Sequence, residues 1–268
     1  MRFRSRPVSF FLSVFIFFSF SAFSGPIEDC AEYAQLGVPG HDGDILCRTG
    51  HLLAHHPEYK TPIWVIERLT KEKATRKVVP RYNRFRADPD IKKGERAELS
   101  DYRGSGYDRG HMAPSANMRW DKQAMIECFY LSNMVPQVGK GMNQGIWKDL
   151  EERSRTWAIE RGEIFIFTGP IYDDGVSKTL GKNRVTVPSR LYKIVYDPGR
   201  QEAIAFIMPN EALKTEDLPL YIVTMREVEE KTGLDFLSSL EKELQDSIET
   251  VRADGLWQEE RDHATVSE

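Results

Sequence analysis

Three short polar segments, well separated along the chain, most constrain how this sequence can fold. Residues 107–114 read Tyr-Asp-Arg-Gly-His-Met-Ala-Pro, residues 131–137 read Leu-Ser-Asn-Met-Val-Pro-Gln, and residues 143–147 read Asn-Gln-Gly-Ile-Trp. An imidazole beside a permanently charged guanidinium, with amides and a carboxylate downstream, is the set of groups that metal-assisted cleavage of a phosphodiester requires. For these groups to act together, the fold must bring the three segments to one place.

Four apolar runs bounded by turn-forming residues predict β-strands over Pro62–Leu69, Glu163–Thr168, Leu191–Tyr196 and Ala203–Met208. Residues 197–200, which read Asp-Pro-Gly-Arg, join the last two runs. Because this connection has the residues that tight turns favour, we expect a hairpin there.

Helices are expected between these strands. The clearest are Asp121–Leu131 and Gln144–Arg161, and a capping box from Thr224 to Glu227 predicts a shorter helix that ends at Gly233. Strands and helices interleave without the strict alternation of βαβ units. The sequence therefore predicts an α+β fold, with a mixed or antiparallel sheet core flanked by helices.

The first 24 residues differ in composition from the rest of the chain. Arg2, Arg4 and Arg6 form a basic start, Phe10–Phe23 is an apolar stretch, and Ala22-Phe23-Ser24 places small residues just before Gly25. This pattern predicts a signal peptide over residues 1–24, a periplasmic or extracellular location, and no stable membrane association after cleavage. An uncleaved membrane anchor is the alternative, but the apolar stretch is shorter than the roughly 20 residues that a spanning helix needs.

Residues 25–268 suit a single domain, with a core over about residues 60–236 and an acidic tail after about residue 247. Cysteines are few in this part of the chain. Cys30 and Cys47 could form a disulfide in an oxidising compartment, and Cys128 lies in an apolar run that predicts a buried thiol. Three cysteines at these spacings do not predict a zinc site.

The charge of the chain is unevenly distributed. Without residues 1–24, which contain three arginines and no acidic residue, the chain has 34 basic and 41 acidic residues and a formal charge of −7. Between Lys71 and Lys122, however, 14 basic residues face 8 acidic ones, a local charge of +6. This window contains the Asp-Arg-Gly-His run, so a basic surface suited to a polyanion is expected beside it.

Within that run, His111 is the expected general base, because a neutral imidazole can take a proton from water near physiological pH. Arg109 keeps its charge and can bind two phosphate oxygens, so we expect it to clamp the substrate and to stabilise the transition state. Gly110 between them allows a backbone conformation or a close approach that a side chain would prevent.

The residues of these segments and their order along the chain resemble those of the DNA/RNA non-specific endonucleases, a family with an Asp-Arg-Gly-His signature and a ββα-metal active site. The similarity extends over about residues 62–236 and includes Thr168-Gly169-Pro170 after a predicted strand. The resemblance implies an endonuclease that cleaves DNA and RNA with little sequence preference and leaves 5′-phosphate ends. It also implies Mg²⁺ as cofactor. Whether Mn²⁺ can substitute for it, and whether an inhibitor protein is a further partner, are left open by the sequence.

The resemblance assigns roles to four more residues. Asn143 is the expected metal ligand, since Mg²⁺ accepts a side-chain carbonyl and keeps most of its waters. Glu151 follows eight residues later, about 12 Å along a helix axis, so we expect it to hydrogen-bond the water ligands of the metal. Asp108 is expected to support the loop, and Asn133 to orient either the phosphate or the reactive loop.

The family also has an upstream arginine that stabilises the transition state, and Arg81 and Arg84 are both candidates for this role. Two alternatives to a nuclease remain open: a non-catalytic nucleic-acid-binding protein with the same fold, and a hydrolase of small phosphodiesters with a closed pocket. The sequence distinguishes neither a monomer from a dimer nor a preference for single strands from one for double strands.

Overall fold

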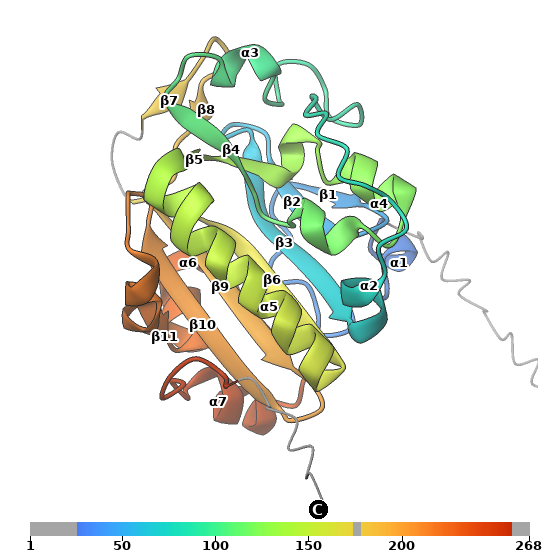
Figure 1. The fold of residues 1–268 in the computed structure, drawn as a ribbon, viewed down its shortest axis with the longest axis vertical. Coiled ribbons are helices and arrows are strands. Elements are labelled where there is room, and N and C mark those ends of the chain that lie inside the picture. Colours follow the sequence, from blue (N-terminus) through green and yellow to red (C-terminus); the bar gives the residue numbers. More distant parts are fainter. Residues whose placement is uncertain (1–25, 174–177, 259–268) are drawn as a thin grey trace, which may run out of the picture.

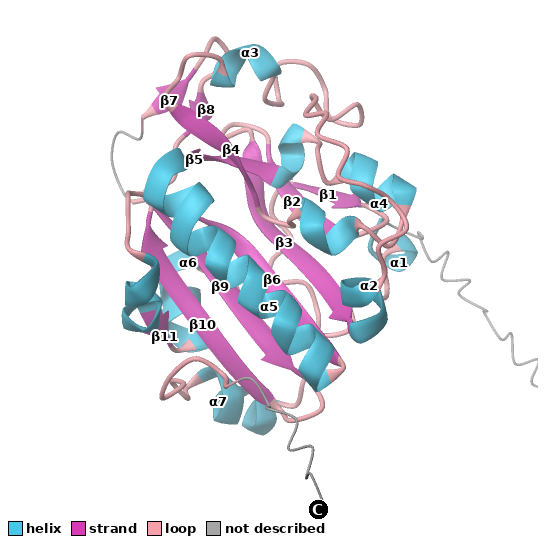
Figure 2. Cartoon of the chain, viewed as in Figure 1, coloured by secondary structure: helices cyan, strands magenta, loops and turns pink. Residues whose placement is uncertain are grey.

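The structure is a computed structural model that describes residues 26–173 and 178–258. In this part of the chain, seven strands form the central sheet, in the order β1-β2-β3-β6-β9-β10-β11 (Figures 1 and 2). Each strand is antiparallel to its neighbours. These strands are β1 (Asp44–Cys47), β2 (Leu52–His56), β3 (Thr61–Thr70), β6 (Glu163–Ile171), β9 (Arg190–Asp197), β10 (Glu202–Pro209) and β11 (Ile222–Val223).

The remaining elements surround this sheet (Figure 1). β4 (Tyr107–His111) pairs with β5 (Met134–Val138), and β7 (Thr179–Leu180) pairs with β8 (Val185–Thr186). The helices are α1 (Pro26–Asp29), α2 (Lys71–Thr75), α3 (Leu99–Tyr102), α4 (Lys122–Glu127), α5 (Trp147–Arg161), α6 (Met225–Thr232) and α7 (Lys242–Glu249). Short 3₁₀ turns cover Ser115–Met118, Leu131–Asn133 and Thr215–Tyr221.

Both faces of the sheet are buried, as β6 illustrates. Ile164 and Ile166 point into one apolar core, whereas Phe165 and Phe167 point into the other. This is the two-residue alternation of a strand covered on both sides. α5 covers the first face with Trp147 and Trp157, and α6 and α7 cover the second with Val228 and Ile248. The predicted α+β fold with an antiparallel sheet core is confirmed. Among the described helices, none combines the length and apolarity that crossing a bilayer would need.

All four predicted strands are present, and the hairpin between β9 and β10 is confirmed. Both longer predicted helices, however, extend too far. The helix expected over Asp121–Leu131 ends at Glu127, and Asn133 Nδ2 donates to the carbonyl of Cys128 at 2.9 Å just beyond that end. The predicted helix at Thr224 is confirmed: its capping box is formed, and α6 stops at Gly233, whose φ is +71°.

The helix expected over Gln144–Arg161 begins as an α-helix only at Trp147. It is preceded by a wide π-type turn over Gly139–Ile146, in which Gly141 has φ +85° and Gly145 has φ −123° and ψ −113°. These backbone angles are incompatible with a regular helix. Asn143 therefore lies on an irregular turn, and its spacing from Glu151 does not follow helical geometry.

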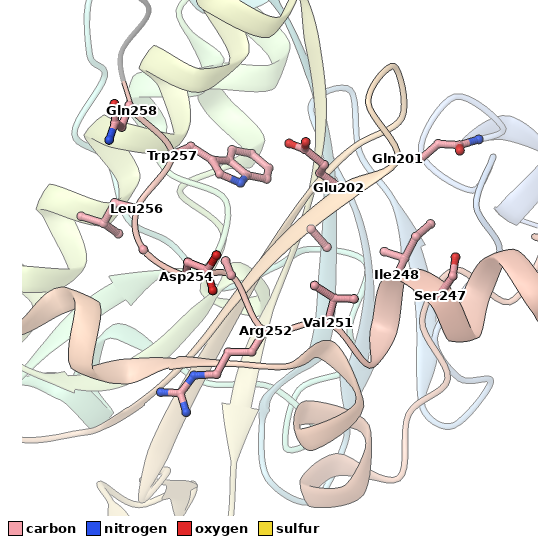
Figure 3. Close-up of a pocket in the computed structure, with 13 residues that line it drawn as sticks. Gln201, Glu202, Ser247, Ile248, Val251, Arg252, Asp254, Leu256, Trp257 and Gln258 are labelled. Carbon is pink, nitrogen blue, oxygen red and sulfur yellow. The ribbon is translucent and has the colours of Figure 1, made fainter.

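The C-terminal segment packs more closely than an acidic tail would. The ring of Trp257, drawn in Figure 3, lies 5.2 Å from that of Trp157 and 3.6 Å from the guanidinium of Arg161. Trp157 Nε1 also donates to the backbone oxygen of Trp257 at 3.1 Å. The part of the tail that the structure describes is thus anchored on α5, because the contacts of Trp257 hold a segment that is otherwise mostly polar.

A disulfide joins Cys30, which follows α1, to Cys47 at the end of β1. It ties the N-terminal segment to the first strand of the sheet. Cys128 is a buried free thiol, and its burial raises the pKa. The signal peptide predicted over residues 1–24 lies outside the described residues.

Candidate active site

A cavity of about 490 Å³ opens between β4, the wide turn before α5, and the loop that leads from α2 to Arg86. β4, β5 and α5 together form the predicted ββα arrangement around it. The cavity brings together six of the residues predicted from the sequence: Arg81, Asp108, Arg109, His111, Asn143 and Glu151. Two other predicted residues, Arg84 and Asn133, are not among its lining residues.

The pairing of β4 with β5 positions the first polar segment. Gly110 lies opposite Val135, and a Cβ atom at Gly110 would overlap the side chain of Gln137. Only glycine fits here without displacing that side chain. Arg109 and His111 are two residues apart, on either side of Gly110, so their side chains leave the strand on one face.

His111 sits in an aromatic enclosure at the end of β4. The centroid of its ring lies 5.4 Å from that of Phe85 and 5.1 Å from that of Phe129. Its Nε2 is buried and has no hydrogen-bond partner among the described residues. Burial lowers the pKa of His111 to about 3, and the charges of Arg81 and Arg109 act in the same direction. The imidazole is therefore neutral at physiological pH, which is the state that a general base needs.

Arg81 and Arg84 occupy different places, although both belong to one loop. Arg81 lines the cavity, and its guanidinium lies 5.6 Å from the centroid of the Phe129 ring, the same ring that packs against His111. Arg84 instead lies over the ring of Tyr82 at 4.8 Å and lines a neighbouring cavity. The geometry thus favours Arg81 over Arg84 as the arginine that reaches the reacting phosphate.

Asp108 fixes the orientation of the amide predicted to bind the metal. Its Oδ2 accepts hydrogen bonds from Asn143 Nδ2 at 2.9 Å and from Gln144 Nε2 at 2.7 Å. With Nδ2 held in this way, the carbonyl oxygen of Asn143 remains available to a cation in the cavity. A carbonyl oxygen backed by a carboxylate suits a hard cation such as Mg²⁺, so the residues present fit the implied metal.

Glu151 and Arg155 project into the same cavity from α5, one helical turn apart. Burial raises the pKa of Glu151 to about 7, while the charges of Lys193, Arg155 and Arg81 oppose this shift. The separation of about 12 Å expected between Asn143 and Glu151 assumed one continuous helix, and that assumption is wrong because of the turn over Gly139–Ile146.

Asn133 lies beneath the cavity and is completely buried. Its Oδ1 accepts from the backbone nitrogen of Ala113 at 2.9 Å, and its Nδ2 donates to the backbone oxygens of Ala113 and Cys128, both at 2.9 Å. These bonds go to the backbone around the reactive segment. Of the two roles predicted for Asn133, the geometry favours holding the reactive loop over contacting phosphate.

A buried polar network supports the helical side of the cavity from the sheet. Lys193 on β9 donates to Thr168 Oγ1 on β6 at 2.8 Å, and its ammonium lies 4.9 Å from the centroid of the Trp147 ring. Glu67 on β3 accepts from Asn117 Nδ2 at 3.0 Å, and Asn117 Oδ1 accepts from Arg155 at 3.3 Å. The two networks connect the central sheet to the start of α5 and to Arg155.

Burial raises the pKa of Glu67 to about 7 and lowers that of Lys193, while the attraction between the two charges opposes both shifts. Neither residue was predicted as part of the site, nor were Asn117 and Arg155. The spacing of Arg155 from Glu151, four residues on a helix, is the one signal in the sequence that could have indicated it.

The model of one protein family, described as "DNA/RNA non-specific endonuclease", matches residues 31–243. The chain belongs to this family. Human mitochondrial endonuclease G is 34% identical over 223 residues, which are 78% of this chain and 74% of the human protein. Mitochondrial Nuclease 1 of Schizosaccharomyces pombe is 33% identical over 233 residues, 80% of this chain and 72% of the yeast protein.

The nuclease is also similar to a solved structure, described as the crystal structure of an EndoG/EndoGI complex that gives the mechanism of EndoG inhibition. The TM-score is 0.77 with 29% identity, and the match covers 85% of this chain and 98% of the other. The predicted resemblance and the predicted fold class are both confirmed by these comparisons.

The predicted export is wrong by the same comparisons. The human and S. pombe relatives are mitochondrial, as is a nuclease of Saccharomyces cerevisiae that is 32% identical over 79% of this chain and 71% of that protein. Residues 1–24 were assigned to a secretory signal because they are basic, apolar and free of acidic residues. Mitochondrial transit peptides are also rich in arginine and serine and poor in acidic residues, so this composition does not separate the two kinds of targeting.

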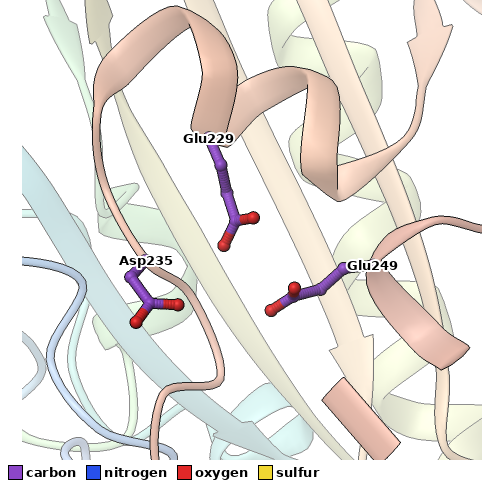
Figure 4. Close-up of side chains that lie close together, drawn as sticks. All are labelled: Glu229, Asp235 and Glu249. Carbon is purple, nitrogen blue, oxygen red and sulfur yellow. The ribbon is translucent and has the colours of Figure 1, made fainter. Parts of the chain in front are cut away.

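A second group of acidic residues lies away from this cavity, at α6 and α7 (Figure 4). One carboxylate oxygen from each of Glu229, Asp235 and Glu249 lies within 4.8 Å of the others. Arg226 pairs with Glu229 at 3.0 Å and with Glu249 at 2.7 Å. Because a guanidinium already neutralises part of this charge, the cluster is a poor match for the catalytic cation.

Proposed function

We propose that this nuclease hydrolyses internal phosphodiester bonds of DNA and RNA with the help of a divalent cation. The observation that supports this most is the neutral, enclosed imidazole of His111 in a cavity with Arg81 and Arg109. Nε2 of His111 is buried, so Nδ1 is the nitrogen that can take a proton from water. A water deprotonated in this way would attack the phosphorus and break its bond to the 3′-oxygen. That oxygen would take a proton from water as it leaves, so the products carry 5′-phosphate and 3′-hydroxyl ends.

The chain's own side chains would bind and orient the phosphate. Arg109 and Arg81 would hold its oxygens and stabilise the charge that develops on them. Asn143 would hold Mg²⁺ through its carbonyl oxygen, with Mn²⁺ as a substitute; the bound ion supplies positive charge to the phosphate and to the leaving oxygen. Glu151 would orient water beside the ion. Since such contacts are made to the backbone of the substrate, they convey little base information.

The first test is incubation of the purified protein with supercoiled plasmid and with structured RNA, in Mg²⁺ and in EDTA. We expect both polymers to be degraded in Mg²⁺ and to stay intact in EDTA. His111→Ala should lower the rate at least about 100-fold, while DNA binding in EDTA is retained. His41→Ala is the matched control, because His41 is exposed and does not line the cavity.

Three outcomes would contradict this proposal. If the wild type leaves both polymers intact in Mg²⁺ and Mn²⁺ but retards them in a gel, the chain is a binding protein with a nuclease fold. If it cleaves a small phosphodiester and ignores the polymers, it is a small-molecule hydrolase. Wild-type rates for His111→Ala would refute the general base.

Two further statements belong to this proposal. Residues 25–268 are proposed to act as a single nuclease domain. The similar solved structure is a complex of EndoG with EndoGI, which supports an inhibitor protein as a partner of this chain as well.

A further inference from the structure

A second cavity of about 490 Å³ adjoins the active site. It is lined by Asn83, Arg84, Phe85, Arg86, Leu99 and Arg109. Three of these residues, Asn83, Phe85 and Arg109, also line the catalytic cavity. The two hollows therefore share a wall, and Arg109 lines both.

The arginines of this second cavity each lie beside an aromatic ring. The guanidinium carbon of Arg109 lies 4.2 Å from the centroid of the Phe85 ring, that of Arg84 lies 4.8 Å from Tyr82, and that of Arg86 lies 4.8 Å from Tyr130. Cation–π contacts of this kind restrain the guanidinium groups. Arg86 also donates from Nη2 to the hydroxyl of Tyr130 at 3.2 Å, and a guanidinium has further N–H groups that can bind an anion.

These guanidinium groups lack acidic partners. In the described part of the chain, Arg84, Arg86 and Arg109 form no ion pair, whereas Arg48, Arg68 and Arg161 each pair with a carboxylate. These three cations are exposed and unneutralised around one hollow, which makes the hollow suited to an anion.

The loop that supplies two of these arginines is fixed at both ends. The backbone nitrogens of Val78 and Val79 both donate to the carbonyl of Arg119 at 3.0 Å. At the other end, Arg86 N donates to Phe129 O at 3.2 Å, and Leu131 N donates to Arg86 O at 2.9 Å. The arginines are thus presented by an anchored segment beside the catalytic cavity.

Apolar surface accompanies this charge. Tyr82 is 40% exposed and Leu99 is 39% exposed, which places both among the exposed large hydrophobic residues of the molecule. An exposed tyrosine beside a basic hollow is suited to stack on a nucleic-acid base, since every base presents an aromatic face.

We propose that the second cavity is a subsite for the nucleotide next to the scissile phosphate in an unpaired strand. Arg84 and Arg86 bind the phosphate of this nucleotide, its base stacks on Tyr82, and Arg109 spans the two phosphates. This inference rests on the proposed nuclease activity. It adds that the enzyme recognises at least two successive phosphates and favours strands whose bases can leave their stack.

The test compares an eight-residue oligothymidylate with a thymidine dinucleotide that has a single phosphodiester. We expect Arg84→Ala to lower kcat/KM for the octanucleotide about 10-fold more than for the dinucleotide. Tyr82→Ala should show a similar difference, and Tyr82→Phe, which keeps the ring, should restore the octanucleotide rate. All these side chains are exposed, so the variants should fold.

Arg252→Ala is the matched control, because Arg252 is an exposed arginine beside a different hollow near the C-terminal segment (Figure 3). Equal losses on the two substrates, or losses no larger than that of Arg252→Ala, would overturn the subsite.

Binding of the octanucleotide in EDTA tests the subsite without turnover. There Arg84→Ala should weaken binding and reduce the dependence of log K on log salt by about 0.7. An inactive wild type would refute the proposed nuclease activity, yet the binding comparison would still decide on the subsite. An unchanged affinity and salt dependence would count against it in either case.

Discussion

Asp108 determines how Asn143 presents its amide, which makes it more than a support for its loop. Its carboxylate oxygen accepts from Asn143 and Gln144 and thereby turns the carbonyl oxygen of Asn143 away from itself. A neighbour that orients a metal ligand typically contributes 10- to 100-fold to metal affinity or activity. The effect of such a residue should appear in the metal titration before it appears in the maximal rate.

We therefore predict that Asp108→Ala raises the Mg²⁺ concentration for half-maximal cleavage by about 10- to 100-fold. Most of the rate should return at high Mg²⁺. The measurement is a titration of initial rate against Mg²⁺, with Asp149→Ala as control, since Asp149 is an acid of α5 that pairs with Arg153 at 2.7 Å. An Asp108→Ala enzyme with a wild-type titration would show that Asn143 is oriented by other contacts.

At this scale, the sequence predicted the residues that belong to a continuous motif. Arg109, His111 and Asn143 were found because the motif orders them along the chain, and all three line one cavity. Arg155 and Asn117 were missed, because what places them at the site is a set of tertiary contacts between the 3₁₀ turn Ser115–Met118, α5 and the sheet. The four-residue spacing of Arg155 from Glu151 indicates that the two share a helix face, but it does not reveal the contact between Arg155 and Asn117.

Among the elements, α5 is the helix that buried polar side chains of the sheet contact from below. It lies over the sheet, and buried polar side chains of β3, β6 and β9 connect to it through Asn117 and Trp147. Buried polar groups cost stability unless they are fully paired. Among the described residues, one oxygen of Glu67 has no hydrogen-bond partner, so burying Glu67 for a purely structural role would lower stability. The contact from Glu67 through Asn117 to Arg155 suggests that this network positions Arg155.

The positioning of Arg155 can be tested by exchanging the hydrogen-bond donor and acceptor between Asn117 and Glu67. Asn117→Asp places a carboxylate against Glu67, where Asn117 now donates at 3.0 Å, and we expect kcat/KM at pH 8 to fall about 10-fold. Adding Glu67→Gln restores a donor on the opposite side and should return the rate to within about 3-fold of wild type. In an Arg155→Ala background, Asn117→Asp should cost little further.

Asp197→Asn is the control for this network. It disturbs another buried ion pair between β9 and α5, the 2.9 Å contact with Arg161, which lies outside the set of cavity-lining residues. It should lower the melting temperature while leaving kcat/KM near wild type. Equal losses in the wild-type and Arg155→Ala backgrounds would mean that Asn117 acts through stability and not through Arg155.

The elements differ in how far the sequence could predict them. β3, β6, β9 and β10 were found because each is a long apolar run in the centre of a sheet covered on both faces. β4 and β5 were not predicted: their polar and glycine-containing segments lack a strand pattern, and their pairing follows from tertiary context. The predicted helix began at Gln144, three residues too early, because the charged sequence after Trp147 was extended back past Gly145, where the backbone angles are not helical.

At the scale of the whole molecule, charge is unevenly distributed. The chain is acidic overall, with a formal charge of −4, yet unneutralised arginines gather around the two adjoining cavities. Glu229, Asp235 and Glu249 instead gather at α6 and α7 (Figure 4). An acidic protein can bind a polyanion when its local field is positive, because salt screens distant charges over about 8–10 Å. The acidic residues at α6 and α7 do not line these cavities, so we expect their ionisation to affect stability.

The stability of the folded protein should depend on pH through Glu249 on α7. Burial raises its pKa to about 7, with the charge of Glu229 adding to the shift and that of Arg226 opposing it. Between about pH 4.5 and 7 the folded protein therefore holds a proton at this site that the unfolded chain has lost. The stabilisation that this proton provides is complete below about pH 4.5 and is lost as the pH rises through about 7.

Glu249→Gln removes this titration, so its melting temperature relative to wild type should rise as the pH increases from 4.5 to 8. Glu67 and Glu151, whose pKa values are also raised to about 7 by burial, are present in both proteins and cancel in the difference. Glu243→Gln, an exposed change on the same helix, should give a difference that is flat with pH. If the Glu249→Gln difference is also flat, or falls with pH, the carboxylate is already ionised in the folded protein at pH 4.5. Its pairing with Arg226 at 2.7 Å would then outweigh its burial.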